Sequence, residues 1–287
     1  MLRQRAVSAT LIVIGTLAVV IAGGWVFFAA ALLTALKALD ELMVMLAKAG
    51  HRPARLLGHL LVAIFFLVAL VNAPGRLLGE ALLLAVVGPL LSVMLRRSLT
   101  GTMLDWAVSV AATLYIGWLA AHAVLLRALP DPFQVDAFLL TDLPAVVMRL
   151  QVSAGTRWAL TAILVTWATD TASFFAGRAW GHRKLAPVLS PGKTWEGAAG
   201  GLAAAVATLV ACALVFQLPL SVPLAAVAGL GLGTLAQLGD LAESLLKRQT
   251  GVKDAGTIIP GHGGVLDRID SLLFTLPAVY YLATFVG

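Results

Sequence analysis

Long apolar runs without charge are the feature that most constrains the fold of this chain. One run, SATLIVIGTLAVVIAG, covers residues 8–23, and others of similar length follow it. A bilayer core about 30 Å thick needs roughly 20 apolar residues in a helix, whereas the strands of a membrane barrel would alternate apolar and polar residues. Hydrophobic residues make up 60% of the 287 residues and charged residues 12%. The sequence therefore predicts an all-α, polytopic integral membrane protein.

We expect about nine transmembrane helices. They cover residues 6–22, 25–47, 56–72, 77–95, 104–126, 157–177, 197–217, 221–239 and 270–286. The basic start MLRQR is compatible with a signal peptide, but the length of the run after it favours a retained first helix. We divide the chain into an N-terminal region of about five spans, residues 1–150, and a C-terminal catalytic membrane region with two polar loops, residues 151–287. The long outer loop 127–157 contains nothing that suggests chemistry.

Lys and Arg residues concentrate on one side of this topology. The N-terminus, the loops HRPAR and RRSLTG, and the stretches 178–196 and 240–269 fall on that side, because each comes before the first span or after an even number of spans. This side carries 15 of the 20 basic residues: Arg3, Arg5, Lys48, Arg52, Arg55, Arg96, Arg97, Arg178, Arg183, Lys184, Lys193, Lys247, Arg248, Lys253 and Arg268. Basic loops stay in the cytoplasm, which predicts a cytoplasmic N-terminus and two polar loops that face the cytosol together.

Ionisable residues inside predicted spans are by default functional or mutually paired, because charge is costly in a bilayer. Asp40 and Glu41 follow Lys37 by three and four residues, so we interpret them as local ion-pair partners rather than functional groups. Asp170 has no cation within one helical turn, and small or polar residues follow it on the same helix face. We therefore expect a functional role for Asp170.

Glycines and the single cysteine carry less information about chemistry. Gly197 and Gly201, and the segment GLGLG at residues 229–233, lie within apolar helices and favour close helix packing. GLGLG lacks the strand–turn–helix setting of a dinucleotide-binding motif. Cys212 is the only cysteine, which excludes a disulfide framework and a multi-cysteine zinc site.

The first polar loop ends in SPGKTWEG, residues 190–197. Ser190 and the proline after it break the chain, and Gly192 and Lys193 come just before the next helix. A helix N-terminus with a nearby lysine and serine can bind an anion, so we expect contact with phosphate. GKT is not a nucleotide-binding P-loop here, because the first glycine of that motif falls on Pro187 and no strand precedes it.

The second polar stretch begins with a patterned helix and ends with paired carboxylates. Asp240, Glu243, Ser244 and Lys247 recur at helical spacing, and leucines occupy the other side, so this polar face should look into the protein or a wet cavity. Asp267 and Asp270 lie three apart at the start of the last span. Together with Asp240 they could bind Mg²⁺, which accepts a few carboxylates, waters and substrate phosphates. The alternative for helix-start carboxylates is interaction with the helix dipole.

The motif GHGGVLDRID, residues 261–270, adds groups suited to phosphate. Gly261, Gly263 and Gly264 let the backbone approach a ligand and expose its amides, and His262 could donate to a phosphate or cap the turn. Four nearby cations supply positive charge: Lys247, Arg248, Lys253 and Arg268. Carboxylates for a metal and cations for phosphates suit phosphoryl chemistry on a charged nucleotide.

At these residues the sequence resembles the phosphatidate cytidylyltransferase, or CDP-diacylglycerol synthase, family. The resemblance covers roughly residues 165–275 and includes DTASFFAGRAWGHRKLAPVLSPGKTWEG and GDLAESLLKR. The C-terminal signature falls on Ser244, Lys247, Arg248, Lys253, Asp254, Pro260, His262, Gly263, Gly264, Asp267, Arg268 and Asp270.

The resemblance implies a Mg²⁺-dependent, bacterial-type inner-membrane enzyme that joins CTP and phosphatidate into CDP-diacylglycerol and releases pyrophosphate, in phospholipid biosynthesis. It places the metal ligands on Asp240, Asp267 and Asp270, and the catalytic Ser and Lys groups on Ser190, Lys193 and Lys247. Asp170, Ser244, Arg248, Lys253, His262, Gly263, Gly264 and Arg268 are expected to bind substrate, and Asp270 to share in catalysis.

Several alternatives stay open at this point. A CTP-dependent polyprenol or phytol kinase would transfer the γ-phosphate instead, and a transporter would use Asp40, Glu41 and Asp170 as its pathway. Membrane lipid is an expected partner and nucleic acid is not. A second, monovalent cation and a homodimer are left open.

Overall fold

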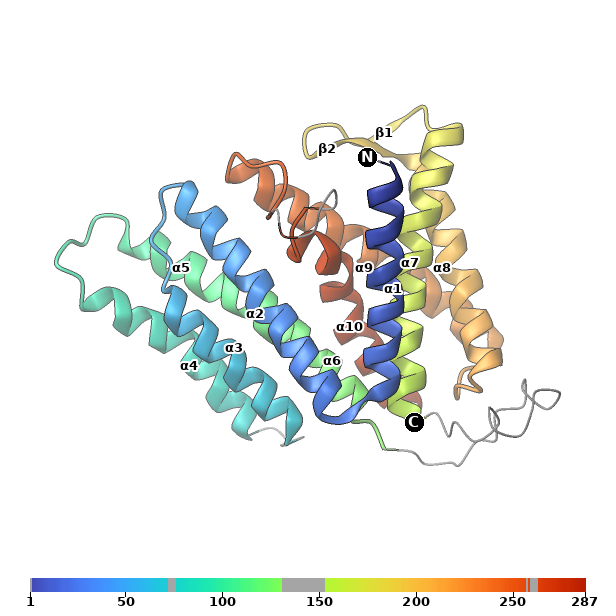
Figure 1. Cartoon of the computed structure of the whole chain (residues 1–287), viewed down its shortest axis with the longest axis horizontal. Coiled ribbons are helices and arrows are strands. Elements are labelled where there is room, and N and C mark those ends of the chain that lie inside the picture. The colour runs from blue at the N-terminus through green and yellow to red at the C-terminus, as the bar shows by residue number, and fades with distance from the viewer. Residues whose placement is uncertain (1, 72–75, 131–152, 257, 259–262) are drawn as a thin grey trace. The chain divides into compact units, whose positions relative to one another are not determined.

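The computed structural model describes residues 2–71, 76–130, 153–256, 258 and 263–287. The elements in chain order are α1 (Leu2–Ala22), α2 (Gly24–Lys48), α3 (Arg55–Leu70), α4 (Arg76–Met94), α5 (Thr102–Thr113), the π-helical segment η1 (Leu114–Trp118), α6 (Leu119–Arg127), α7 (Ala154–Trp180), β1 (Lys184–Ala186), β2 (Ser190–Thr194), α8 (Trp195–Val215), α9 (Val222–Gln249) and α10 (Leu266–Val286) (Figure 1). Most of the outer loop, residues 131–152, lies outside the described residues, as does His262.

The described helices confirm an α-helical membrane protein. Six of them are long and apolar enough to cross a bilayer: Leu77–Met94, Thr102–Arg127, Ala154–Trp180, Trp195–Val215, Val222–Gln249 and Leu266–Val286. Thr10–Ala22 and Arg55–Leu70 are apolar but shorter, and α2 is long but interrupted by charge at Lys37, Asp40 and Glu41. The number of nine spans therefore stays a prediction.

The chain forms two compact units that interleave in sequence. Unit 1 contains Met1–Leu125 and Ala242–Leu273, and unit 2 contains Leu126–Leu241 and Phe274–Gly287. Each predicted polar loop thus belongs to its own unit: residues 178–196 to unit 2, and most of 240–269 to unit 1. The functional division at residue 150 stays a prediction.

In unit 2, α7 and α8 pack along each other (Figure 1). Both helices begin at a side-chain cap: the hydroxyl of Ser153 accepts the backbone N–H of Thr156 at 3.2 Å, and that of Thr194 accepts Gly197 N–H at 3.1 Å. A Cβ at Gly197 would lie 2.8 Å from the Ser173 carbonyl oxygen of α7. The predicted packing role is confirmed for Gly197, because a side chain there would separate the helices.

The segment between α7 and α8 contains the one clear departure from the all-helical prediction within the described residues. Strands β1 and β2 pair antiparallel, with Lys184 opposite Thr194 and Ala186 opposite Ser190. The carboxylate of Glu196 accepts the backbone N–H groups of His182 and Arg183 at 3.1 and 3.2 Å, which ties the hairpin to the first turn of α8. The hairpin therefore replaces the expected irregular loop and holds β2 in a defined position.

Helices α8 and α9 pack closely at Gly229. A Cβ at Gly229 would lie 2.7 Å from the Cα of Val206, whereas a Cβ at Gly231 would meet nothing within 4 Å. We expect Gly229→Ala to lower the free energy of unfolding by about 1–3 kcal/mol, because the backbone of α8 cannot yield easily. Gly231→Ala, on the same helix, should leave it unchanged or raise it by about 0.5–1 kcal/mol. Thermal unfolding in detergent measures both, and equal melting temperatures for the two variants would contradict the packing account.

In unit 1, α2, α3, α4 and α5 pack as neighbours. Their core includes the fully buried rings of Phe65 and Phe66. In the second half of α2, Asp40 forms ion pairs with Arg55 and, at 3.3 Å, with Lys37. The predicted local pairing is confirmed for Asp40.

Glu41 departs from the same prediction. Its side chain is buried, with 4% exposed, and its Oε2 accepts the backbone N–H of Leu266 at 2.9 Å. The interpretation of Glu41 as a local partner of Lys37 was wrong, because the carboxylate points to a segment 225 residues further along the chain.

Candidate active site

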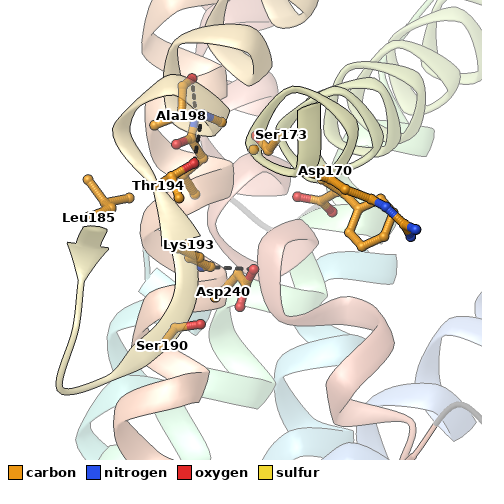
Figure 2. Close-up of a pocket in the computed structure, with 14 residues that line it drawn as sticks. Asp170, Ser173, Leu185, Ser190, Lys193, Thr194, Ala198 and Asp240 are labelled. Atoms are coloured by element: carbon orange, nitrogen blue, oxygen red, sulfur yellow. Dashed lines mark hydrogen bonds and ion pairs between the residues drawn. The ribbon is translucent and has the colours of Figure 1, made fainter. Parts of the chain in front are cut away.

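A pocket of about 380 Å³ lies within unit 2, where α7, the hairpin, α8 and α9 meet (Figure 2). Four predicted site residues line it: Asp170, Ser190, Lys193 and Asp240. Gly177, Gly192 and Gly197 also line the pocket, so small residues border it on several elements. The structure therefore brings together the functional aspartate predicted in α7 and the polar residues predicted in the first loop.

Lys193 and Asp240 form the charged centre of this pocket. The Nζ of Lys193, on β2, lies 2.8 Å from Oδ2 of Asp240, on α9 (Figure 2). The side chains are 22% and 38% exposed, although the Nζ atom of Lys193 is itself buried. A lysine held by one carboxylate oxygen keeps donors for a phosphate, and the second oxygen of Asp240 can accept another cation.

Ser173 contributes a hydroxyl to the same pocket. It lies one turn after Asp170 on α7, and its buried Oγ has no hydrogen-bond partner among the described residues. Gly201 of α8 makes room for it, because a Cβ there would collide with this Oγ. Ser173 is one of the small or polar residues that follow Asp170 on its helix face, but the sequence did not single it out as a ligand.

A second polar cluster lies within unit 1, at the C-terminal part of α9 and the start of α10. Lys247 forms ion pairs with Glu243 and, at 2.7 Å, with Oδ1 of Asp267. Glu243 and Asp270 each offer a carboxylate oxygen, and these oxygens lie within 4.8 Å of each other. Glu243 and Asp267 thus flank one ammonium group, and the carboxylate of Asp270 lies beside that of Glu243.

Asp267 is held on both of its oxygens. Besides Lys247 on Oδ1, its Oδ2 accepts the backbone N–H groups of Gly264 at 2.8 Å and Ala255 at 3.0 Å. Gly263 has a φ of +80°, and a Cβ there would lie 2.6 Å from Oδ2 of Asp267. The glycines of the motif therefore let the backbone fold around this carboxylate.

Glu243 is a candidate that sequence reasoning left out of its list of metal ligands. Its side chain is 1% exposed, and its Oε1 has no hydrogen-bond partner among the described residues. The residue lies three positions after Asp240 on α9, so both carboxylates face the same side of the helix. The periodic polar face in the sequence already contained this signal, and the expectation that this face looks inward is confirmed for Glu243 and the buried Ser244.

The remaining predicted residues lie at the edge of the cluster or outside the described part. Arg248, Lys253 and Arg268 are exposed in unit 1, where they can meet a solvent-borne anion. Gly263 and Gly264 lie beside Asp267, as described above. His262, predicted to contact substrate, lies outside the described residues.

Comparison with known proteins decides the family. The model of the cytidylyltransferase family matches residues 3–286, nearly the whole chain. The chain belongs to the cytidylyltransferase family. This match extends the resemblance seen at residues 165–275 to the N-terminal helices, where the sequence offered only hydropathy.

Similar members of the cytidylyltransferase family are named phosphatidate cytidylyltransferase. The chain is 47% identical to that of Bacillus subtilis over 128 residues, 45% of this chain and 48% of the relative. It is 44% identical over 130 residues to one from Staphylococcus epidermidis, 45% and 50% of the two chains, and 52% identical over 118 residues to one from Brucella suis, 40% and 43%. The chain thus spans about half the length of the relatives it matches.

Proposed function

We propose that the chain is a phosphatidate cytidylyltransferase, which transfers the cytidylyl group of CTP to phosphatidate. The observation that carries the proposal is the pairing of lysines with carboxylates at two places along α9: Lys193 with Asp240 at 2.8 Å, and Lys247 with Asp267 at 2.7 Å. This chemistry suits two anionic substrates, and the family membership and the names of the relatives support it.

In the proposed reaction a phosphate oxygen of phosphatidate attacks the α-phosphorus of CTP. A new phosphorus–oxygen bond forms, the bond from that phosphorus to the bridging oxygen breaks, and pyrophosphate leaves. A phosphomonoester is already nucleophilic near neutral pH, so no covalent enzyme intermediate is needed. The protein aligns the reactants and offsets charge, as in other phosphoryl transfers; Lys193 and Lys247 offer the ammonium groups for this task.

The donor set fits a magnesium ion. Glu243 and Asp270 supply hard carboxylate oxygens within 4.8 Å of each other, and Oε1 of Glu243 is buried without a hydrogen-bond partner among the described residues. We therefore propose that Glu243 and Asp270, both in unit 1, would hold Mg²⁺, while Asp240 stays a ligand predicted from the sequence. Asp267, predicted as a ligand, would instead orient Lys247, or its side chain would move to join the ion. When bound, Mg²⁺ would polarise the phosphates and neutralise charge on the leaving group.

The charge distribution supports a bacterial-type inner-membrane location with the site at the cytoplasmic side. Fifteen of the 20 basic residues fall on one side of a nine-span topology with the N-terminus inside, and basic loops are retained in the cytoplasm. In this proposal the acyl chains of phosphatidate stay in the bilayer while its phosphate reaches the polar residues of α9 and α10. CTP would arrive from the cytosol, where exposed Arg248, Lys253 and Arg268 offer positive charge.

The product of the reaction tests the proposal. Purified protein in detergent is incubated with phosphatidate, Mg²⁺ and CTP labelled either in the cytidine or in the γ-phosphate. We expect the cytidine label in the lipid fraction and the γ-label in pyrophosphate. Transfer of the γ-label to an added polyprenol, with no cytidine in lipid, would instead identify a CTP-dependent lipid kinase.

A further inference from the structure

Glu41 connects the N-terminal helices with the motif around Asp267. It lies on α2, outside every motif of the sequence, and belongs to unit 1 together with residues 242–273. Its side chain is 4% exposed. A carboxylate is rarely buried to this degree unless it has a defined partner.

The partner of Glu41 is the first turn of α10. Oε2 accepts the backbone N–H of Leu266 at 2.9 Å, and α10 begins at Leu266. The first N–H groups of a helix have no partner within the helix, and the helix dipole favours negative charge there. Glu41 thus caps α10 from another helix, one residue before Asp267.

The backbone around Asp267 fits closely against Glu41. A Cβ at Gly256 would lie 2.5 Å from Oε1 of Glu41, and a Cβ at Gly264 would collide with Oε2. The N–H of Gly264 donates in turn to Asp267 at 2.8 Å. The same glycine therefore contacts Glu41 on one side and holds Asp267 on the other, and a change at Glu41 reaches Asp267 through one residue.

Asp40 shows what an ordinary structural carboxylate in this helix does. It is partly exposed and pairs with Lys37 and Arg55, near the end of α2 and the start of α3. Within the described residues Glu41 forms no ion pair, and its Oε2 instead accepts the backbone N–H of Leu266, beside a charged cluster. Stabilisation of α2 alone does not explain why a carboxylate should be directed there.

We infer that Glu41 is a positioning residue: it fixes the start of α10 and thereby the orientation of Asp267 and of Lys247, which Asp267 holds at 2.7 Å. The inference rests on the proposed function for its catalytic consequence. It gives the N-terminal helices a role in the reaction, although they contribute no motif of their own. Displacement of a catalytic group by about 1 Å can lower turnover about 100-fold.

Glu41→Leu tests the inference by removing the acceptor while keeping apolar bulk. We expect faster hydrogen–deuterium exchange at the amides of residues 263–270 and a kcat lowered about 10–100-fold, with exchange in α3 and α7 unchanged. Glu41→Gln keeps an oxygen that can accept the Leu266 N–H and should restore slow exchange and most of kcat. Asp40→Asn, the adjacent carboxylate, should change neither quantity.

The outcomes separate positioning from general stability. Exchange that rises throughout unit 1, or a kcat per folded molecule equal to wild type in Glu41→Leu, would overturn the inference. If Glu41→Leu does not fold, Gly256→Ala is the second variant, because its added methyl group crowds Oε1 of Glu41. Gly256→Ala should raise exchange at residues 263–270. Unchanged exchange there would also overturn the inference. Hydrogen–deuterium exchange is measured without substrates. If the wild-type protein forms no CDP-diacylglycerol, the proposed function is wrong. The exchange data would still decide whether Glu41 positions the start of α10.

Discussion

Replacing Asp270 with asparagine should lower the rate of cytidylyl transfer roughly 1000-fold, which corresponds to about 4 kcal/mol of transition-state stabilisation. The substitution keeps the size of the side chain but removes a negative charge beside Glu243, whose carboxylate oxygen lies within 4.8 Å. The backbone N–H of Ser271 donates to Oδ1 of Asp270 at 2.7 Å, and an asparagine oxygen can still accept it. The helix start should therefore persist while the affinity for the metal falls.

The labelled-CTP assay in detergent measures this loss, and the melting temperature confirms that the variant is folded. Glu80→Gln is the matched control, because it removes an exposed carboxylate from α4 of the same unit. Its rate should stay within about twofold of wild type, as for most surface substitutions. Asp270→Asn protein that is folded and keeps more than a tenth of the activity would contradict the assigned role.

Replacing Lys193 with methionine should lower kcat/KM for CTP about 100- to 1000-fold, the usual cost of losing one preorganised donor to a developing charge. Lys193 lies 2.8 Å from Asp240 inside the pocket of unit 2. Methionine keeps most of the length of the side chain and leaves the Asp240 carboxylate without its cation. The lost ammonium group and the unpaired carboxylate both disfavour an anionic substrate in the pocket.

Lys184 supplies the control for this prediction. It lies on β1 of the same hairpin, opposite Thr194, and its side chain is exposed. Lys184→Met removes the same charge from the same loop and should change kcat/KM by about twofold at most. Equal losses in the two variants would show that the loop acts only through its overall positive charge, contrary to the specific role of Lys193.

The helices could be predicted from the sequence because neighbouring residues determine where each helix begins and ends. The expected helix at 197–217 is found at Trp195–Val215, and the polar face after residue 239 correctly indicated that α9 continues beyond its apolar part, to Gln249. The hairpin was missed because β1 has only three residues, too few for an alternating pattern. Prolines at positions 187 and 191 also favoured an irregular loop.

The candidate site was predictable to the extent that its residues lie in patterned segments. Asp170, Lys193 and Asp240 come from three such segments, and the pocket in unit 2 contains all three. Glu41 could not be found in this way, because its partner lies 225 residues away and its spacing from Lys37 suggested a local ion pair. A single sequence shows which side chains share a helix face, but it does not show which helices meet.

Binding of Mn²⁺, a paramagnetic substitute for Mg²⁺, tests the central claim that carboxylates of α9 and α10 hold a divalent ion. Electron paramagnetic resonance of the purified protein, titrated with Mn²⁺ in detergent without nucleotide, should reveal a site that Mg²⁺ competes for. Asp270→Asn and Glu243→Gln should each weaken this binding about tenfold or more, whereas Glu80→Gln should bind as wild type does. Unchanged Mn²⁺ affinity in folded Asp270→Asn and Glu243→Gln would contradict the account.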